Sequence, residues 1–256
     1  MPRVPQSAGR SDQLEIPSHR VRWGLRDMAF AGLTTLGLVG AGALLLAGGA
    51  LLWPRLSALP LPANILVPAV FACEALLIIP AWLWGPRKYG GGWASLGLRA
   101  CSVGKSLALL FLGFSAILLV NAAWDAARQR LGWPGQPDYL PVFGGGLQGL
   151  LVALLLGGAV APAAEEIFFR GYIFAGLRER WGTGAAVVLS SILFSLAHAT
   201  PGVFPPLFII GAVFCLIYEH TDSLWPCVAL HGAMNGLAFA VAYLSERFPD
   251  LVRGGM

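Results

Sequence analysis

The feature that most constrains this chain is a series of apolar stretches close to the length at which a helix crosses a bilayer, about 20 residues. Between residues 28 and 244 the sequence predicts about seven such spans. They cover residues 28–52, 64–84, 106–124, 143–164, 184–199, 203–218 and 224–244. We therefore expect an all-α fold, a multi-pass transmembrane helical bundle.

The composition indicates the same solvent. Hydrophobic residues make up 57% of the chain and charged residues only 12%, whereas soluble proteins carry about 25% charged residues. The mean hydropathy is +0.70. Basic residues are scattered at the ends of the apolar stretches rather than gathered in one patch, so we expect the lipid bilayer as a partner and no nucleic acid.

The order of the spans predicts the domain organisation. Residues 1–27 form a basic tail, 28–142 the first helices and loops, 143–246 a motif-bearing core, and 247–256 a C-terminal tail. The first apolar run exceeds the about 7–15 residues of a cleavable signal, which predicts a retained anchor. With seven alternating spans and the N-terminus in the cytosol, 12 of the 17 basic residues lie inside the cell. We expect an integral protein of the cell membrane in that orientation.

Two adjacent carboxylates, Glu165 and Glu166, follow the fourth apolar run and precede Arg170. Ionisable groups at membrane depth are costly, so they need partners or a task. On a helix Glu166 and Arg170 form an i,i+4 pair, which predicts a supporting, structural role. Glu165 points about 100° away from Glu166 and is the candidate proton acceptor. Hydration of both carboxylates at the membrane surface is the alternative.

The later spans contribute three more polar side chains. His198 lies near the end of the fifth span, one turn after Phe194, and a lone histidine there is more often an interfacial or satisfied core residue than a catalytic one. His231 and Asn235 lie at i,i+4 in the last span, so both face the same side of the helix. A hydrogen bond between these two side chains is the structural alternative to a shared polar cavity.

These residues together supply the groups needed to hydrolyse an amide. Glu165 would take a proton from water that His198 positions, while His231 and Asn235 donate hydrogen bonds to the oxyanion. Glu165, His198 and His231 also match the ligand set of a catalytic zinc ion with one open position. The residues alone leave both mechanisms open.

Three motifs in this order resemble the family of CAAX-protease and bacteriocin-processing intramembrane proteases, which includes the prenyl-protein CAAX endoprotease. The motifs are Glu165-Glu166-x-x-x-Arg170, Phe194-x-x-x-His198 and His231-x-x-x-Asn235, within residues 149–244. The resemblance implies an active site between the fourth, fifth and last spans. There, Glu165 and His198 activate water and His231 and Asn235 bind the oxyanion.

The resemblance also implies the reaction. A family member of this kind is an intramembrane endopeptidase that cuts a membrane-associated protein or peptide near its C-terminus. Its substrate can be lipid-modified or membrane-anchored. We expect a glutamate mechanism that requires no cofactor, with zinc held by Glu165, His198 and His231 as the metal-dependent alternative.

Two other function classes fit part of the pattern. A non-enzymatic immunity or regulatory protein could keep the fold and bind a partner. A proton-coupled transporter also uses carboxylates and histidines inside the membrane, although the sequence lacks a repeated pair of broken helices. Glu74, within the second span, could bind a ligand or extend its carboxylate to the membrane surface, and we leave it outside the predicted site.

Overall fold

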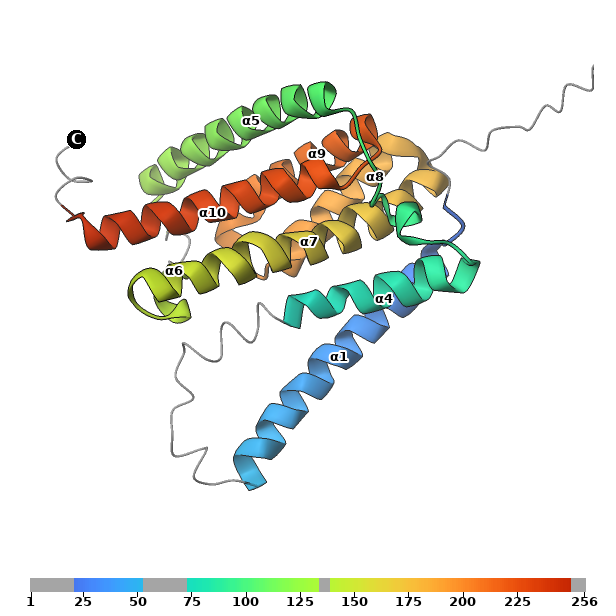
Figure 1. The fold of residues 1–256 in the computed structure, drawn as a ribbon, viewed down its shortest axis with the longest axis horizontal. Coiled ribbons are helices and arrows are strands. Elements are labelled where there is room, and N and C mark those ends of the chain that lie inside the picture. Colours follow the sequence, from blue (N-terminus) through green and yellow to red (C-terminus); the bar gives the residue numbers. More distant parts are fainter. Residues whose placement is uncertain (1–20, 53–72, 134–138, 250–256) are drawn as a thin grey trace, which may run out of the picture.

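The computed structural model describes residues 21–52, 73–133 and 139–249. Within these ranges the chain is helical and contains no strand, so the predicted all-α class is confirmed. Figure 1 shows the arrangement of the α-helices. They are α1 (Leu25–Leu52), α4 (Ile78–Trp82), α5 (Val103–Arg130), α6 (Gly146–Leu155), α7 (Ala161–Glu166), α8 (Ala175–Ala197), α9 (Phe204–Thr221) and α10 (Trp225–Arg247).

Short helical segments of other types join the long helices. Tight 3-10 turns cover Ala75–Leu77, Trp93–Leu96, Leu140–Phe143 and Pro201–Val203. Wider π-helical segments cover Leu83–Arg87, Leu156–Val160 and Ile167–Phe174. The last two flank α7, so the helix that carries Glu165 and Glu166 has a π-helical turn on either side. Such turns occur frequently at functional sites.

Four described helical stretches are long and apolar enough to cross a bilayer, and the protein is an integral membrane protein. They are Val103–Arg130, Gly146–Ala197, Pro201–Thr221 and Trp225–Arg247. The predicted first span coincides with helix α1, which is not one of these four stretches, and residues 64–72 of the second span lie outside the described residues. The count of seven spans therefore stays a prediction.

The fourth predicted span does not end where we expected. We placed its end at residue 164 and counted Arg170 among the cytosolic loop residues, but the helix continues through Arg170 to a break at Gly182 (φ 77°, ψ 168°). Arg170 is 0% exposed. The π-helical turn after Glu166 widens the helix without ending it. Arg170 thus belongs to the interior and carries no information on orientation.

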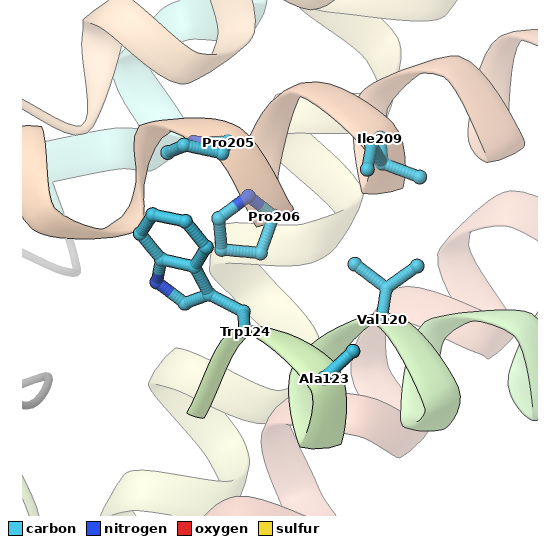
Figure 2. Close-up of a pocket in the computed structure, with 6 residues that line it drawn as sticks. All are labelled: Val120, Ala123, Trp124, Pro205, Pro206 and Ile209. Atoms are coloured by element: carbon cyan, nitrogen blue, oxygen red, sulfur yellow. The ribbon is translucent and has the colours of Figure 1, made fainter. Parts of the chain in front are cut away.

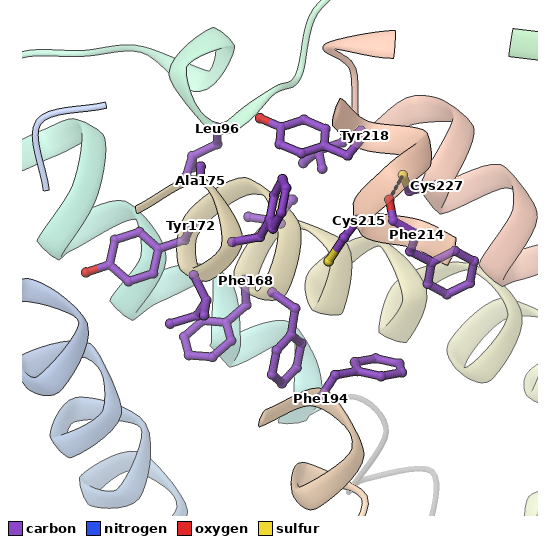
Figure 3. Close-up of a cluster of buried hydrophobic side chains, with 14 of the residues drawn as sticks. Leu96, Phe168, Tyr172, Ala175, Phe194, Phe214, Cys215, Tyr218 and Cys227 are labelled. Carbon is purple, nitrogen blue, oxygen red and sulfur yellow. Dashed lines mark hydrogen bonds between the residues drawn. The ribbon is translucent and has the colours of Figure 1, made fainter. Parts of the chain in front are cut away.

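The helices pack as a bundle around the middle of this long helix. α8 packs along α9, α9 along α5, and α10 against α6, α7 and Leu156–Val160, while α1 lies beside α4 at one side (Figure 1). Every residue of Ile167–Phe174 is buried. Figure 3 shows this turn in the apolar core, with Phe194 of α8 and Phe214 of α9 in the same cluster.

The segment before α5 fixes the start of α10. The Gly97 carbonyl accepts a hydrogen bond from the Leu224 amide at 2.8 Å. Gly97 has φ 84°, a conformation that glycine tolerates best, and a Cβ atom there would lie 2.5 Å from the Tyr218 ring. A Cβ atom on Gly171 would collide with the Leu96 carbonyl oxygen. This close backbone packing sets the position of α10 against the helix that carries Glu166.

Candidate active site

Glu166 is the centre of a buried polar network. Its Oε1 accepts hydrogen bonds from Arg170 Nη1 at 3.0 Å and from His231 Nδ1 at 2.9 Å. Glu166 and Arg170 are 0% exposed and His231 is 7% exposed. The i,i+4 pair expected from the sequence is confirmed. The bond to His231 adds a link between α7 and α10 that the sequence did not predict.

Arg170 is held between two aromatic rings. Its guanidinium carbon lies 4.2 Å from the centre of the Phe194 ring and 4.9 Å from that of Phe214. Its Nη2 donates to the Gly211 carbonyl at 3.4 Å. A desolvated cation over an aromatic face gains about 2 kcal/mol. Helices α8 and α9 therefore both contribute to stabilising the charge that neutralises Glu166.

His198 caps the end of α8, where its side chain is exposed. Its Nδ1 is 2.8 Å from the Phe194 carbonyl oxygen, and its ring meets the edge of the Phe194 ring at 4.7 Å between centres. A carbonyl oxygen can only accept, so Nδ1 carries the proton. In the neutral ring Nε2 is then an acceptor, which suits a group that holds or activates water.

His231 and Asn235 are not bonded to each other. His231 Nδ1 faces Glu166, and the His231 ring stacks on Phe214 at 5.1 Å between centres. Asn235 Nδ2 donates to the Gly157 carbonyl at 2.9 Å, within the π-helical segment before α7. The two side chains thus connect α10 to both sides of α7. The alternative of a mutual hydrogen bond is wrong.

Glu165 stands apart from this network. Its Oε2 is buried and has no hydrogen-bond partner among the described residues. Within the same ranges, no hydrogen bond or ion pair joins Glu165 to His198, His231 or Asn235. The structure therefore brings Glu166, Arg170 and His231 into direct contact, places His198 beside Phe194, which also covers Arg170, and leaves Glu165 with an unused acceptor.

The predicted zinc ligands do not form a ligand cluster in this arrangement. Among residues 21–52, 73–133 and 139–249, no group of three His, Cys, Asp or Glu side chains could hold a metal ion. Glu165, His198 and His231 therefore do not fit a shared ion as they lie here.

Three contributors to the site were not predicted from the sequence. Phe214 and the Gly211 carbonyl contact Arg170 across helices, and no spacing along the chain indicates such a contact. Glu74 was considered and left out, yet it directly precedes Ala75–Leu77, which packs against α7, and its Oε2 is buried. The sequence does indicate that Glu74 needs a partner or a function, because it is an isolated carboxylate in an apolar stretch.

A groove between α5 and α9 is entirely apolar and contains none of the predicted site residues. Figure 2 shows its lining residues, Val120, Ala123, Trp124, Pro205, Pro206 and Ile209. The Trp124 indole donates to the Gly202 carbonyl at 2.9 Å and so fixes one wall of the groove.

Comparison with known proteins identifies the part of the chain that carries this network. Residues 147–237 match the family described as type II CAAX prenyl endopeptidase Rce1-like. This part of the chain is similar to the Rce1-like family. The matched range contains all six residues of the predicted site, so the resemblance inferred from the three motifs is confirmed.

Two curated proteins are similar to the Rce1-like part of the chain. One, from Bacillus subtilis (strain 168) and named "Putative membrane peptidase YdiL", is 29% identical over 89 residues. The match covers 35% of this chain and 36% of that protein. The other, "UPF0177 protein YxdF" from Lactococcus lactis subsp. lactis (strain IL1403), is 25% identical over 96 residues, covering 37% of this chain and 52% of that protein. No solved structure matches the chain.

Proposed function

We propose that this protein is an intramembrane endopeptidase of the CAAX type, which hydrolyses a peptide bond near the C-terminus of a membrane-associated protein. The observation that carries the proposal is the buried contact of Glu166 with Arg170 and His231 inside the Rce1-like segment. An interior network of this kind is costly to bury unless every member has a partner. Here it orients the motif residues of α7 and α10.

The two adjacent glutamates have different roles in this proposal. Glu166 Oε1 already accepts two hydrogen bonds, so Glu166 acts as a structural anchor. Glu165 has a buried oxygen with no hydrogen-bond partner among the residues that the structure describes, so it is available to accept a proton from water. General base catalysis of this kind contributes about 10²- to 10⁴-fold in rate.

His198 would hold the water through Nε2, because its Nδ1 proton is committed to the Phe194 carbonyl. The water oxygen forms a bond to the scissile carbonyl carbon while Glu165 takes one water proton. The carbonyl electrons move onto oxygen. When the oxyanion collapses, the carbon–nitrogen bond breaks, and Glu165 returns the proton to the leaving amine.

His231 and Asn235 would stabilise the oxyanion. Because Nδ1 of His231 already donates to Glu166, Nε2 can donate only when the ring carries both protons. Asn235 keeps one amide hydrogen free after bonding to the Gly157 carbonyl. Loss of one oxyanion donor lowers the rate by about 10²- to 10³-fold.

The substrate in this proposal is a membrane-anchored or lipid-modified protein or peptide that reaches the site from the membrane. We further propose that the protein lies in the cell membrane with its N-terminus in the cytosol. A topology reporter fused to the N-terminus tests the orientation, and a reporter signal from outside the cytosol would contradict it.

The experiment that tests the reaction compares the C-termini of membrane proteins by mass spectrometry in three strains. These strains express the intact protein, Glu165→Ala or, as a matched control, Glu246→Ala, which removes an exposed carboxylate near the end of α10. We expect a truncated C-terminus that is present with the intact protein and the control and absent with Glu165→Ala. Identical profiles in all three strains would contradict proteolysis.

A non-enzymatic role is the second candidate, and one observation favours it. Glu166, Arg170 and His231 satisfy one another, and Asn235 bonds to backbone, so these residues also make sense as structural connections between helices. In that case Glu165→Ala would restore whatever a deletion strain loses. Failure of Glu165→Ala to restore the phenotype, with normal membrane levels, would exclude this role.

A further inference from the structure

A second carboxylate, Glu74, belongs to a helix that packs against α7 from outside the family match. Glu74 lies at the start of the described helix that continues through Ala75–Leu77 into α4, and Ala75–Leu77 packs against α7. Glu165 lies on α7, so the two carboxyl groups belong to helices that are in direct contact. Two carboxyl groups from separate helices therefore share one helix interface.

Both carboxyl groups have an unused acceptor. Glu74 Oε2 and Glu165 Oε2 are buried, and neither has a hydrogen-bond partner among the described residues. The cation in the interior, Arg170, is bound to Glu166. Most buried polar atoms in proteins are hydrogen-bonded, so a pair of orphaned oxygens at one interface needs an explanation.

Electrostatics supplies the explanation. No ion pair joins either carboxylate to a cation within residues 21–52, 73–133 and 139–249, and two neighbouring carboxylates without such a cation cannot both be charged cheaply in a low-dielectric interior. If one of them carries a proton, it becomes a donor and the other becomes its acceptor. The two orphaned oxygens then satisfy each other.

We propose that Glu74 is a positioning residue, whose protonated carboxyl group donates a hydrogen bond to the Glu165 carboxylate and holds it in the orientation needed to accept a proton from water. The catalytic part of this inference rests on the proposed peptidase function. The contact between Glu74 and Glu165 does not depend on that function.

Activity tests the positioning role. The probe is a fluorescence-quenched peptide with a farnesylated CAAX C-terminus, added to the purified full-length protein in lipid vesicles. Glu74→Ala should lower kcat at least ~10-fold and leave KM unchanged, because a misplaced catalytic group slows the reaction without altering substrate binding. Glu74→Gln, whose amide still donates, should keep kcat within about threefold of the wild type.

Leu76→Ala provides the matched control, because Leu76 is exposed and lies two residues away. Its kcat should equal that of the wild type. Wild-type kcat in Glu74→Ala would overturn the inference. A loss in Glu74→Gln as large as in Glu74→Ala would also overturn it, since donation by residue 74 would then not be the property that matters.

A double-mutant cycle tests the contact without any substrate. Thermal unfolding is compared for Glu74→Gln, Glu165→Gln and the double variant, and we expect the two shifts in Tm to be non-additive because the side chains are partners. Additive shifts would overturn the contact even if the protein cleaves peptides. Non-additive shifts in a protein that cleaves nothing would instead refute the peptidase proposal and the catalytic role of Glu74.

Discussion

Replacing Glu166 by glutamine removes one negative charge from the buried network and keeps the side-chain shape. Arg170, which is fully buried, then lacks a counter-charge. Breaking a buried ion pair by removing one partner costs about 3–5 kcal/mol. The glutamine oxygen can still accept a hydrogen bond from His231, so we expect the free energy of unfolding to fall by about 3–5 kcal/mol, mainly from the stranded Arg170 charge.

A second variant separates charge from packing. Arg170→Met alone should lower the free energy of unfolding by about 2 kcal/mol, because the cation no longer contacts the Phe194 and Phe214 rings. It also leaves the Glu166 carboxylate with His231 as its remaining partner. When Glu166→Gln is combined with Arg170→Met, neither of these two positions carries a buried charge that lacks its counter-charge. The double variant should therefore be at least ~2 kcal/mol more stable than the sum of the single losses predicts.

The assay is unfolding of the purified protein in detergent micelles, followed by circular dichroism. Asp125→Asn serves as control, because Asp125 pairs with Arg128 on the exposed surface of α5, where such pairs contribute at most about 1 kcal/mol. A loss in Glu166→Gln no larger than that of the control would refute the reasoning. Additive losses in the double variant would do the same.

Three further predictions concern activity and helix packing. Glu165→Gln should abolish cleavage of the peptide probe while changing the free energy of unfolding by less than about 1 kcal/mol, as measured in the same two assays, because Glu165 has no ion pair among the described residues. Gly232→Ala would place a Cβ atom 2.5 Å from the Gly158 carbonyl oxygen, so it should separate α10 from the segment before α7 and lower both Tm and cleavage. Gly97→Ala should destabilise the protein by at least ~1 kcal/mol in chemical unfolding, because φ is 84° there and the Tyr218 ring leaves no room for a methyl group.

Local sequence patterns predicted the parts of the site that lie within one helix. The i,i+4 spacing of Glu166 and Arg170 was sufficient to predict their ion pair, because that spacing fixes the separation of side chains on a helix. The same spacing placed His231 and Asn235 on one face. It could not give their partners, and both bond to the segment around α7 instead of to each other.

The end of the fourth helix was harder to predict for a physical reason. Charged residues after an apolar run usually mark the surface of the membrane, so Arg170 was counted as a loop residue. The structure buries it instead, because Glu166 neutralises it and the rings of Phe194 and Phe214 replace its water. Those compensating groups come from three helices, and no window along the chain contains them together.

The sequence by itself determined that the chain is a helical membrane protein, which residues are related to the Rce1-like family, and that Glu166 pairs with Arg170. These features depend on composition, on motif order and on the repeat of a single helix. Only the tertiary structure decided that His231 binds Glu166, that Asn235 binds the Gly157 carbonyl, and that the helix of Glu74 packs against α7, which carries Glu165. These contacts join residues that are distant in the chain, so they depend on how the helices rotate and pack against one another. The π-helical turns on either side of α7 contribute to that rotation.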